Sequence, residues 1–128
     1  MSEKFTVEII SPDRSVIKTE TSEVIIPSYD GEMGILKDHI PLITFLRPGI
    51  VKIVDEDDKI FFVEEGTVEF ADNNLLILTS SAKRLSEIDK NLLNNLISEA
   101  ETKISKNDLS DKEKYLLTYK INTLKNIN

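Results

Sequence analysis

The period of the hydrophobic pattern changes once along this chain, at Leu85. Before that residue, apolar side chains alternate or form short β-branched runs, as in Phe5, Val7 and Ile9. Alternation of this kind is typical of strands with one buried face. After Leu85, apolar residues recur at steps of three and four, which places them on one face of a helix. The sequence therefore predicts an α+β protein, with its strands first and its helices last.

Turn signals divide the first part of the chain into eight or more short strands. Ser11-Pro12-Asp13, Arg47-Pro48-Gly49 and Ala71-Asp72-Asn73-Asn74 are typical of turns. The charged run Asp55-Glu56-Asp57-Asp58 is interpreted as a solvated hairpin tip rather than a metal site. Because no helical segment separates these strands, we predict an antiparallel β-sandwich domain over residues 1–84.

Residues 85–128 are predicted to form a second domain, an antiparallel hairpin of two helices of about 18 residues each. Ser86 and Asp89 are interpreted as the N-terminal capping pair of the first helix, and Ser110 and Glu113 as the capping box of the second. The break between them is expected at Asn107-Asp108-Leu109. Since neither helix would persist alone in water, each must bury its apolar stripe. Mutual packing explains the stripes most economically, with partner binding as the alternative.

Charge argues against two classes of partner. The chain has 16 basic and 23 acidic residues in 128, a formal net charge of -7. Nucleic acid demands a basic face, and so does an anionic membrane surface. No apolar run approaches the roughly 20 residues that cross a bilayer, and the N-terminus shows no apolar signal segment. We therefore expect a cytoplasmic protein without direct membrane insertion.

Residue types also limit the chemistry. The absence of cysteine excludes disulfides and thiolate metal sites, and one histidine disfavours zinc, so no metal is expected. No phosphate-binding glycine loop is present, and no cofactor is expected. His39 has no serine nucleophile in an elbow motif, and a histidine beside Ile40-Pro41 is more typical of a structural or interface residue. We predict that the chain is not an enzyme by itself.

The segment 30–49 has the most distinctive composition in the chain. It holds three glycines, two prolines and the only histidine between β-type apolar runs. Gly31 and Gly34 permit a sharp turn, so Glu32 and Met33 are expected to project from an exposed loop rather than enter a core. Because loops carry function more often than the elements they join, this loop is expected to contact a partner.

Residues 24–49 resemble the signature of the bacterial F-type ATP synthase epsilon subunit family. The matching elements are Gly-Glu-x-Gly-Ile-Leu from Gly31, His-x-Pro-Leu-Ile-Thr from His39, and Leu-x-Pro-Gly from Leu46. A second block, from Gly66 to Thr79, resembles the family's Gly-x-x-Glu-Val strand pair. The helical hairpin that follows also fits the family in length and order.

The resemblance implies a non-catalytic central-stalk (rotor) subunit of a proton-translocating F-type ATP synthase, which couples c-ring rotation to ATP synthesis. The implied partners are the gamma subunit, the c ring and, through the hairpin, the alpha/beta catalytic head. The implied location is peripheral, on the cytoplasmic face of the bacterial plasma membrane. Glu32 would accept charge-assisted hydrogen bonds from a c-loop arginine, with plain solvent exposure as the alternative. The contact residues carried over are Asp30, Gly31, Glu32, Met33, Gly34, His39, Pro41 and Leu42.

The regulatory role of the hairpin stays open. ATP-binding members carry Ile/Leu-Asp-x-x-Arg-Ala at the start of the first helix, and this chain has Ile88-Asp89-Lys90-Asn91-Leu92-Leu93. Leucine in place of arginine predicts weak ATP binding or none. The second helix carries a net charge of +2 from its lysines and acidic residues. That face either docks on the acidic surface of the catalytic head or is solvated.

Two other classes of protein compete with the rotor interpretation. One is a free-standing cytoplasmic β-sandwich adaptor that uses the same loop for an unrelated partner. The other, weaker hypothesis is a small hydrolase or isomerase built around His39 and a carboxylate.

Overall fold

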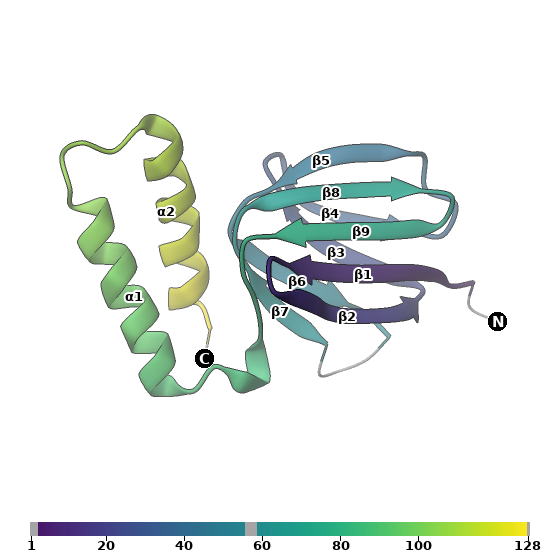
Figure 1. Cartoon of the computed structure of the whole chain (residues 1–128), viewed down its shortest axis with the longest axis horizontal. Coiled ribbons are helices and arrows are strands. Elements are labelled where there is room, and N and C mark those ends of the chain that lie inside the picture. Colours follow the sequence, from purple (N-terminus) through teal and green to yellow (C-terminus); the bar gives the residue numbers. More distant parts are fainter. Residues whose placement is uncertain (1–2, 56–58, 128) are drawn as a thin grey trace.

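The computed structural model describes residues 3–55 and 59–127, and it confirms an α+β protein in which ten strands precede two helices (Figure 1). The charged run predicted as a hairpin tip lies outside the described residues at positions 56–58. The strands are β1 (Phe5–Ser11), β2 (Arg14–Thr21), β3 (Glu23–Ser28), β4 (Gly31–Leu36), β5 (Leu42–Leu46), β6 (Gly49–Ile53), β7 (Ile60–Val63), β8 (Gly66–Ala71), β9 (Asn74–Thr79) and β10 (Ala82–Arg84). A 3₁₀ turn (Leu85–Glu87) leads to α1 (Lys90–Ile104) and α2 (Asp111–Lys125).

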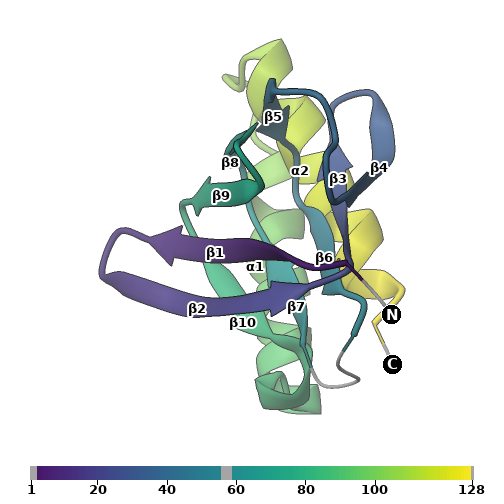
Figure 2. The same ribbon diagram turned by 90° about the vertical axis from the view of Figure 1, so that its right-hand side faces the viewer.

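The strands follow one hydrogen-bonded path that wraps around a single core (Figure 2). Its order is β10-β7-β6-β3-β5-β8-β9-β1-β2, and β4 pairs with β3 beside this path. Among the described residues every neighbouring pair is antiparallel except β1 and β9, which run parallel. The predicted antiparallel β-sandwich is confirmed, with one parallel pair that the sequence did not indicate. Strands β2 to β8 lie between β1 and β9 along the chain, and this long connection allows the two strands to pair in parallel.

The core is filled by side chains at alternate positions along the strands, which face inward. In β1 the buried positions are Phe5, Val7 and Ile9, as the alternation predicted. The Phe5 and Phe70 rings meet edge to face, with centroids 5.5 Å apart. Phe5 lies on β1 and Phe70 on β8, the two neighbours of β9 in the sheet, so this contact packs three adjacent strands around the same part of the core.

Segment 31–34 is a strand and not the exposed loop that its glycines suggested. Gly31 has a positive φ of 118° and ends the turn after β3. From there β4 pairs with β3, with Met33 opposite Ile26 and Gly34 opposite Ile25. Strand alternation then turns Met33 toward the core, where it is partly buried, while Glu32 is exposed. The prediction that Met33 projects into solvent was wrong, because β3 pairing outweighs the turn preference of glycine.

The bend at Arg47-Pro48-Gly49 joins two consecutive strands, β5 and β6, that pair with different strands of the sheet. β5 pairs with β8 and β6 pairs with β7, so these two strands do not form a hairpin with each other. A Cβ at Gly49 would lie 2.6 Å from Pro27 Cβ. Glycine is therefore required here by the close approach of β3, rather than by the freedom of its own dihedral angles.

The two helices are each 15 residues long, shorter than predicted. Ser86 does not cap α1, because residues 85–87 form the 3₁₀ turn. Asp89 is the N-cap, and its carboxylate accepts a hydrogen bond from the Leu92 N–H at 2.8 Å. The predicted capping box at Ser110 and Glu113 is confirmed. Its hydrogen bonds from the Ser110 N–H and hydroxyl lower the pKa of the Glu113 carboxyl.

α2 lies between α1 and the sandwich (Figure 1). The stripes of both helices contribute to this packing, and Ala100, Leu116 and Leu124 are buried. Mutual packing of the hairpin is thus observed, together with packing on the sandwich. Within the described parts of the chain, neither helix combines the length and apolar character needed to span a bilayer.

Candidate functional site

The residues predicted to contact partners lie at two opposite ends of β4. Asp30 and Gly31 belong to the turn between β3 and β4, on the side of the helices, and Glu32 follows them. His39, Pro41 and Leu42 lie beyond the other end of β4. Six residues of extended strand span about 20 Å. The expectation that one loop carries all of these residues was wrong, because a paired strand separates them.

An arginine surrounded by tyrosines joins α2 to the sandwich on the helix side. The Arg47 guanidinium lies 3.8 Å from the centroid of the Tyr119 ring and donates to the Tyr29 carbonyl and the Tyr115 hydroxyl, both at 3.4 Å. The Tyr29 and Tyr115 rings lie 5.2 Å apart. Burial raises the pKa of Tyr29, and Tyr115 and Glu65 add to the effect. We call Tyr29, Arg47, Tyr115 and Tyr119 the tyrosine cluster.

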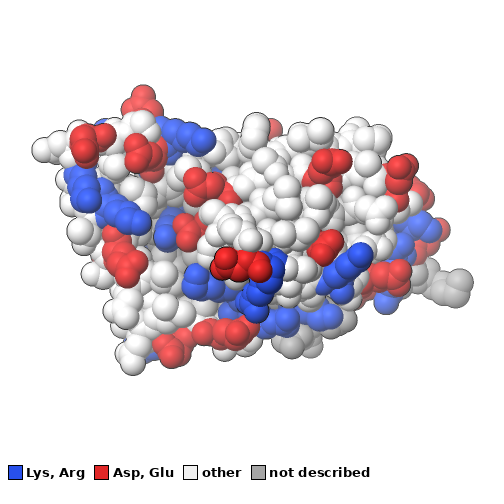
Figure 3. All heavy atoms as spheres, viewed as in Figure 1, with Lys and Arg blue, Asp and Glu red and all other residues white. Residues whose placement is uncertain are grey.

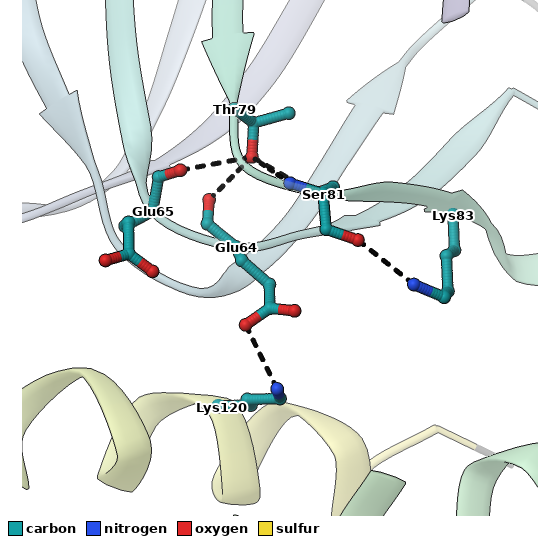
Figure 4. A network of polar contacts seen from close by, with 6 residues as sticks. All are labelled: Glu64, Glu65, Thr79, Ser81, Lys83 and Lys120. Atoms are coloured by element: carbon teal, nitrogen blue, oxygen red, sulfur yellow. Dashed lines mark hydrogen bonds and ion pairs between the residues drawn. The ribbon is translucent and has the colours of Figure 1, made fainter. Parts of the chain in front are cut away.

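An ion pair adds a second contact between the helical hairpin and the sandwich. Lys120 Nζ of α2 lies 3.0 Å from Glu64 Oε1, and the two side chains are only 14% and 22% exposed (Figure 4). The Thr79 hydroxyl lies 3.0 Å from the Glu64 carbonyl and so fixes the chain that carries this carboxylate. Lys125 pairs with Glu101 of α1 at 3.0 Å. Lys120 and Lys125 contribute to the positive charge of α2, for which a solvated or a head-binding face was considered. Both lysines form ion pairs within this chain.

The tyrosine cluster gives a testable expectation about α2. Tyr119→Leu keeps an apolar side chain but removes the ring under the Arg47 guanidinium, a contact of about 1 kcal/mol. We expect hydrogen exchange of the α2 amides to quicken about fivefold. Tyr119→Phe is the control, because it retains the ring and should leave exchange unchanged. Equal exchange in wild type and Tyr119→Leu would show that the cation–π contact does not hold α2 down.

Large apolar side chains lie exposed on the outer face of the sheet. Ile40, Ile43 and Phe45 are 75%, 77% and 60% exposed, and Leu78 is 43% exposed. Phe45 pairs with Thr67, and Thr67 pairs with Leu78 on the next strand. The surface over β5 and β8 is largely uncharged, whereas basic residues gather over β1 and β2 (Figure 3). We call Ile40, Ile43, Phe45 and Leu78 the apolar strip, and a patch of this kind marks a protein contact.

Sequence reasoning missed the apolar strip, although a signal for it was present. β5 reads Leu42-Ile-Thr-Phe-Leu46, with apolar residues at both inward and outward positions. A strand with one solvated face would alternate with polar residues. An apolar run on both faces therefore indicates that something covers the outer face as well.

His39 has structural contacts that account for it. Its Nδ1 lies 2.8 Å from the Ile40 carbonyl oxygen, and its ring meets Phe70 edge to face at 6.0 Å. Its backbone N–H donates to the Leu36 carbonyl at 3.1 Å. No cluster of three or more potential metal ligands occurs within residues 3–55 and 59–127. These contacts fix the conformation of the loop and bring no nucleophile to the imidazole.

The start of α1 carries the segment in which leucine replaces the arginine of the ATP-binding motif. The Asp89 carboxylate already caps the helix. A nearby cavity of about 470 Å³ is lined by five apolar residues, among them Ile88 and Leu93, together with Asn94 and two lysines, and no arginine is among its described lining residues. Calorimetry with the full chain is therefore expected to show ATP binding weaker than micromolar. A relative that carries the arginine motif serves as the positive control. A micromolar dissociation constant for this chain would contradict the expectation.

Comparisons with known proteins agree with this architecture. The family model described as "ATP synthase, Delta/Epsilon chain, beta-sandwich domain" matches residues 4–85. An ATP synthase epsilon chain of Pelagibacter ubique is 45% identical over 130 residues, covering 100% of both chains. The chloroplastic epsilon chain of Pyropia yezoensis is 37% identical, covering 90% of this chain and 86% of its own.

Solved structures share the fold. A chain in the mitochondrial ATP synthase of Euglena gracilis (OSCP/F1/c-ring) has a TM-score of 0.71 at 22% identity, covering 95% of this chain and 78% of that chain. A chain in the Tetrahymena thermophila mitochondrial ATP synthase (central stalk/c-ring) has a TM-score of 0.69 at 16% identity, covering 97% and 96%. With the sequence match over its full length and the sandwich model over most of it, this chain belongs to the ATP synthase epsilon chain family.

Proposed function

We propose that this chain is a non-catalytic rotor subunit of a proton-translocating F-type ATP synthase, joining the gamma subunit to the c ring. The observation that carries the proposal is the apolar strip, which leaves three large side chains more than half exposed on a folded sandwich. Membership of the epsilon chain family and the likeness to chains in c-ring structures support the same role. The chain would transmit rotation without catalysing a reaction itself.

The apolar strip suits the gamma subunit. It continues from the His39–Leu42 segment along β5, so the predicted contact residues His39, Pro41 and Leu42 border it. A permanent stalk needs an interface that resists torque, and apolar burial on a rigid sheet provides one. Phe45 also approaches Tyr29, with ring centroids 6.1 Å apart, which links the gamma-facing surface to the tyrosine cluster.

The opposite end of β4 suits the polar loops of the c ring. Asp30 and Glu32 are exposed there on a turn that Gly31 closes with a positive φ. Carboxylates at such a position can accept charge-assisted hydrogen bonds from c-loop arginines. Gly34 and Met33 support this end from within the β3–β4 pair rather than by contact with the ring.

The hairpin over residues 85–128 is proposed to regulate ATP hydrolysis, whereas the sandwich attaches the chain to gamma and the c ring. Besides the apolar packing of α2, its contacts with the sandwich include the tyrosine cluster, the Glu64–Lys120 pair and a hydrogen bond from the Thr123 hydroxyl to the Pro48 carbonyl. The polar and charged groups of these contacts can separate into water. Release of α2 would free it to reach the alpha/beta catalytic head. The whole chain would then be a peripheral protein on the cytoplasmic face of the bacterial plasma membrane.

Affinity purification of the tagged chain from membranes of its own cells tests this function. We expect mass spectrometry to identify gamma with the alpha and beta subunits, and c under conditions that preserve the ring. Purification of the Ile43→Lys variant is the matched control, because it alters the apolar strip alone. Recovery of an unrelated partner would favour an adaptor and would refute the rotor assignment.

A further inference from the structure

Two surface segments far apart in the sequence are joined by one pair of side chains. Asn73, in the turn between β8 and β9, accepts a hydrogen bond from the Asp38 N–H through its Oδ1 at 2.7 Å. Its Nδ2 donates to Asp38 Oδ1 at 3.0 Å. Asp38 lies in the loop between β4 and β5. We call these reciprocal hydrogen bonds the Asp38–Asn73 clasp.

Both residues of the clasp occupy the left-handed region of backbone space. Asp38 has a φ of 64° and Asn73 a φ of 57°. Aspartate and asparagine tolerate this region better than other non-glycine residues, but it still has a cost unless the surroundings hold it. The clasp supplies that restraint, and the Asn73 carbonyl adds to it by accepting the Thr6 N–H at 3.1 Å.

The clasp fixes a loop whose tip is the exposed Ile40. His39 holds the same loop from its other side, through its N–H to the Leu36 carbonyl and its ring against Phe70. With both sides held, Ile40 stays 75% exposed at the end of the apolar strip, rather than folding back onto the sheet. A loop that is ordered before it binds loses less conformational entropy on binding.

We propose that Asn73 is a positioning residue for the gamma interface, acting through Asp38 to hold Ile40 in line with Ile43 and Phe45. This inference rests on the proposed function, because it takes gamma as the occupant of the apolar strip. The strip supports a protein partner on its own grounds: Ile40, Ile43 and Phe45 lie on one loop and the strand that follows it, and each is more than half exposed. Asn73 itself needs no contact with the partner.

Glycine substitutions distinguish the effect of the side-chain hydrogen bonds from the effect of backbone strain at positive φ. Asn73→Gly and Asp38→Gly each keep a residue that accepts positive φ. Asn73→Gly removes both hydrogen bonds, whereas Asp38→Gly removes only the one from Asn73 Nδ2, because the backbone N–H at position 38 still donates to Asn73 Oδ1. Asp38→Asn is the matched control, because its side-chain oxygen still accepts from Asn73. The full-length variants are titrated against a purified alpha–beta–gamma head stripped of this subunit. Melting temperature and hydrogen exchange of the loop amides are measured in parallel.

The expected result is a loss of affinity of about tenfold in Asn73→Gly and a smaller loss in Asp38→Gly, with wild-type affinity in Asp38→Asn. The double glycine variant should lose no more than Asn73→Gly alone, because Asn73→Gly already removes both hydrogen bonds of the clasp. Wild-type affinity in the glycine variants would overturn the inference and leave the proposed function intact. Failure of the wild-type chain itself to bind the head would overturn the proposed function, and the inference with it. Should Asn73→Gly not fold, Asp38→Gly tests the hydrogen bond from Asn73 Nδ2 alone, and wild-type affinity in that variant would likewise overturn the inference.

Discussion

Gly66→Ala is expected to cause a large loss of stability, because of the four glycines this one has the closest neighbours. A Cβ at position 66 would lie 1.9 Å from the Leu78 carbonyl oxygen and 2.8 Å from the Thr79 Cα. Both are backbone atoms of β9, which pairs with β8 at this point, so no side-chain rotation can relieve the overlap. The two strands would have to separate. We expect a loss of about 3 kcal/mol or more in the free energy of unfolding, measured by urea denaturation.

Gly34→Ala is the matched control for this effect. Its Cβ would meet only the end of the Glu23 side chain, at 2.9 Å from Oε2, and that side chain can move away. We expect a change within about 0.5 kcal/mol. If Gly66→Ala proved as mild as Gly34→Ala, the close pairing of β8 with β9 described above would be wrong.

Ile43→Lys is expected to lower the affinity for the alpha–beta–gamma head about 100-fold while leaving the fold intact. Ile43 is 77% exposed, so its replacement removes nothing from the core. It pairs with Glu69 across β5 and β8, and a lysine opposite a glutamate is a favourable cross-strand pair. In the complex, the substitution loses the burial of an isoleucine and introduces a charge into an apolar interface. Isothermal titration of the stripped head with each variant measures the effect.

Thr102→Lys controls for the added charge. Thr102 is exposed on α1, away from the apolar strip, and the substitution changes the net charge by the same amount. Its affinity should match that of wild type. Equal affinities for Ile43→Lys and wild type would mean that gamma binds elsewhere on the sandwich.

The sequence predicted those features whose causes are local. The alternation in β1 placed Phe5, Val7 and Ile9 in the core, and the spacing of Ser110 and Glu113 identified a capping box. Both depend on neighbours within a few residues. The turn predicted at Gly31 and Gly34 failed because its outcome depends on pairing with β3, and the first capping pair failed because a 3₁₀ turn displaced the helix start.

The candidate site was less accessible from the sequence, because its contacts join distant segments. The motif identified His39 and Glu32, but not that a strand sets them at opposite ends. Arg47 was interpreted as part of a turn, and its contact with Tyr119 comes from the packing of α2. Asp38 and Asn73 meet only because the fold brings two turns to one end of the sandwich. No sequence pattern within either turn predicts this contact.

The most direct test of the rotor assignment is ATP synthesis by energised membrane vesicles stripped of this chain and then supplied with it. The account predicts that stripped vesicles make little ATP, that the wild-type chain restores synthesis, and that Ile43→Lys does not at the same concentration. ATP synthesis at the full rate without the chain, or equal restoration by both proteins, would contradict it.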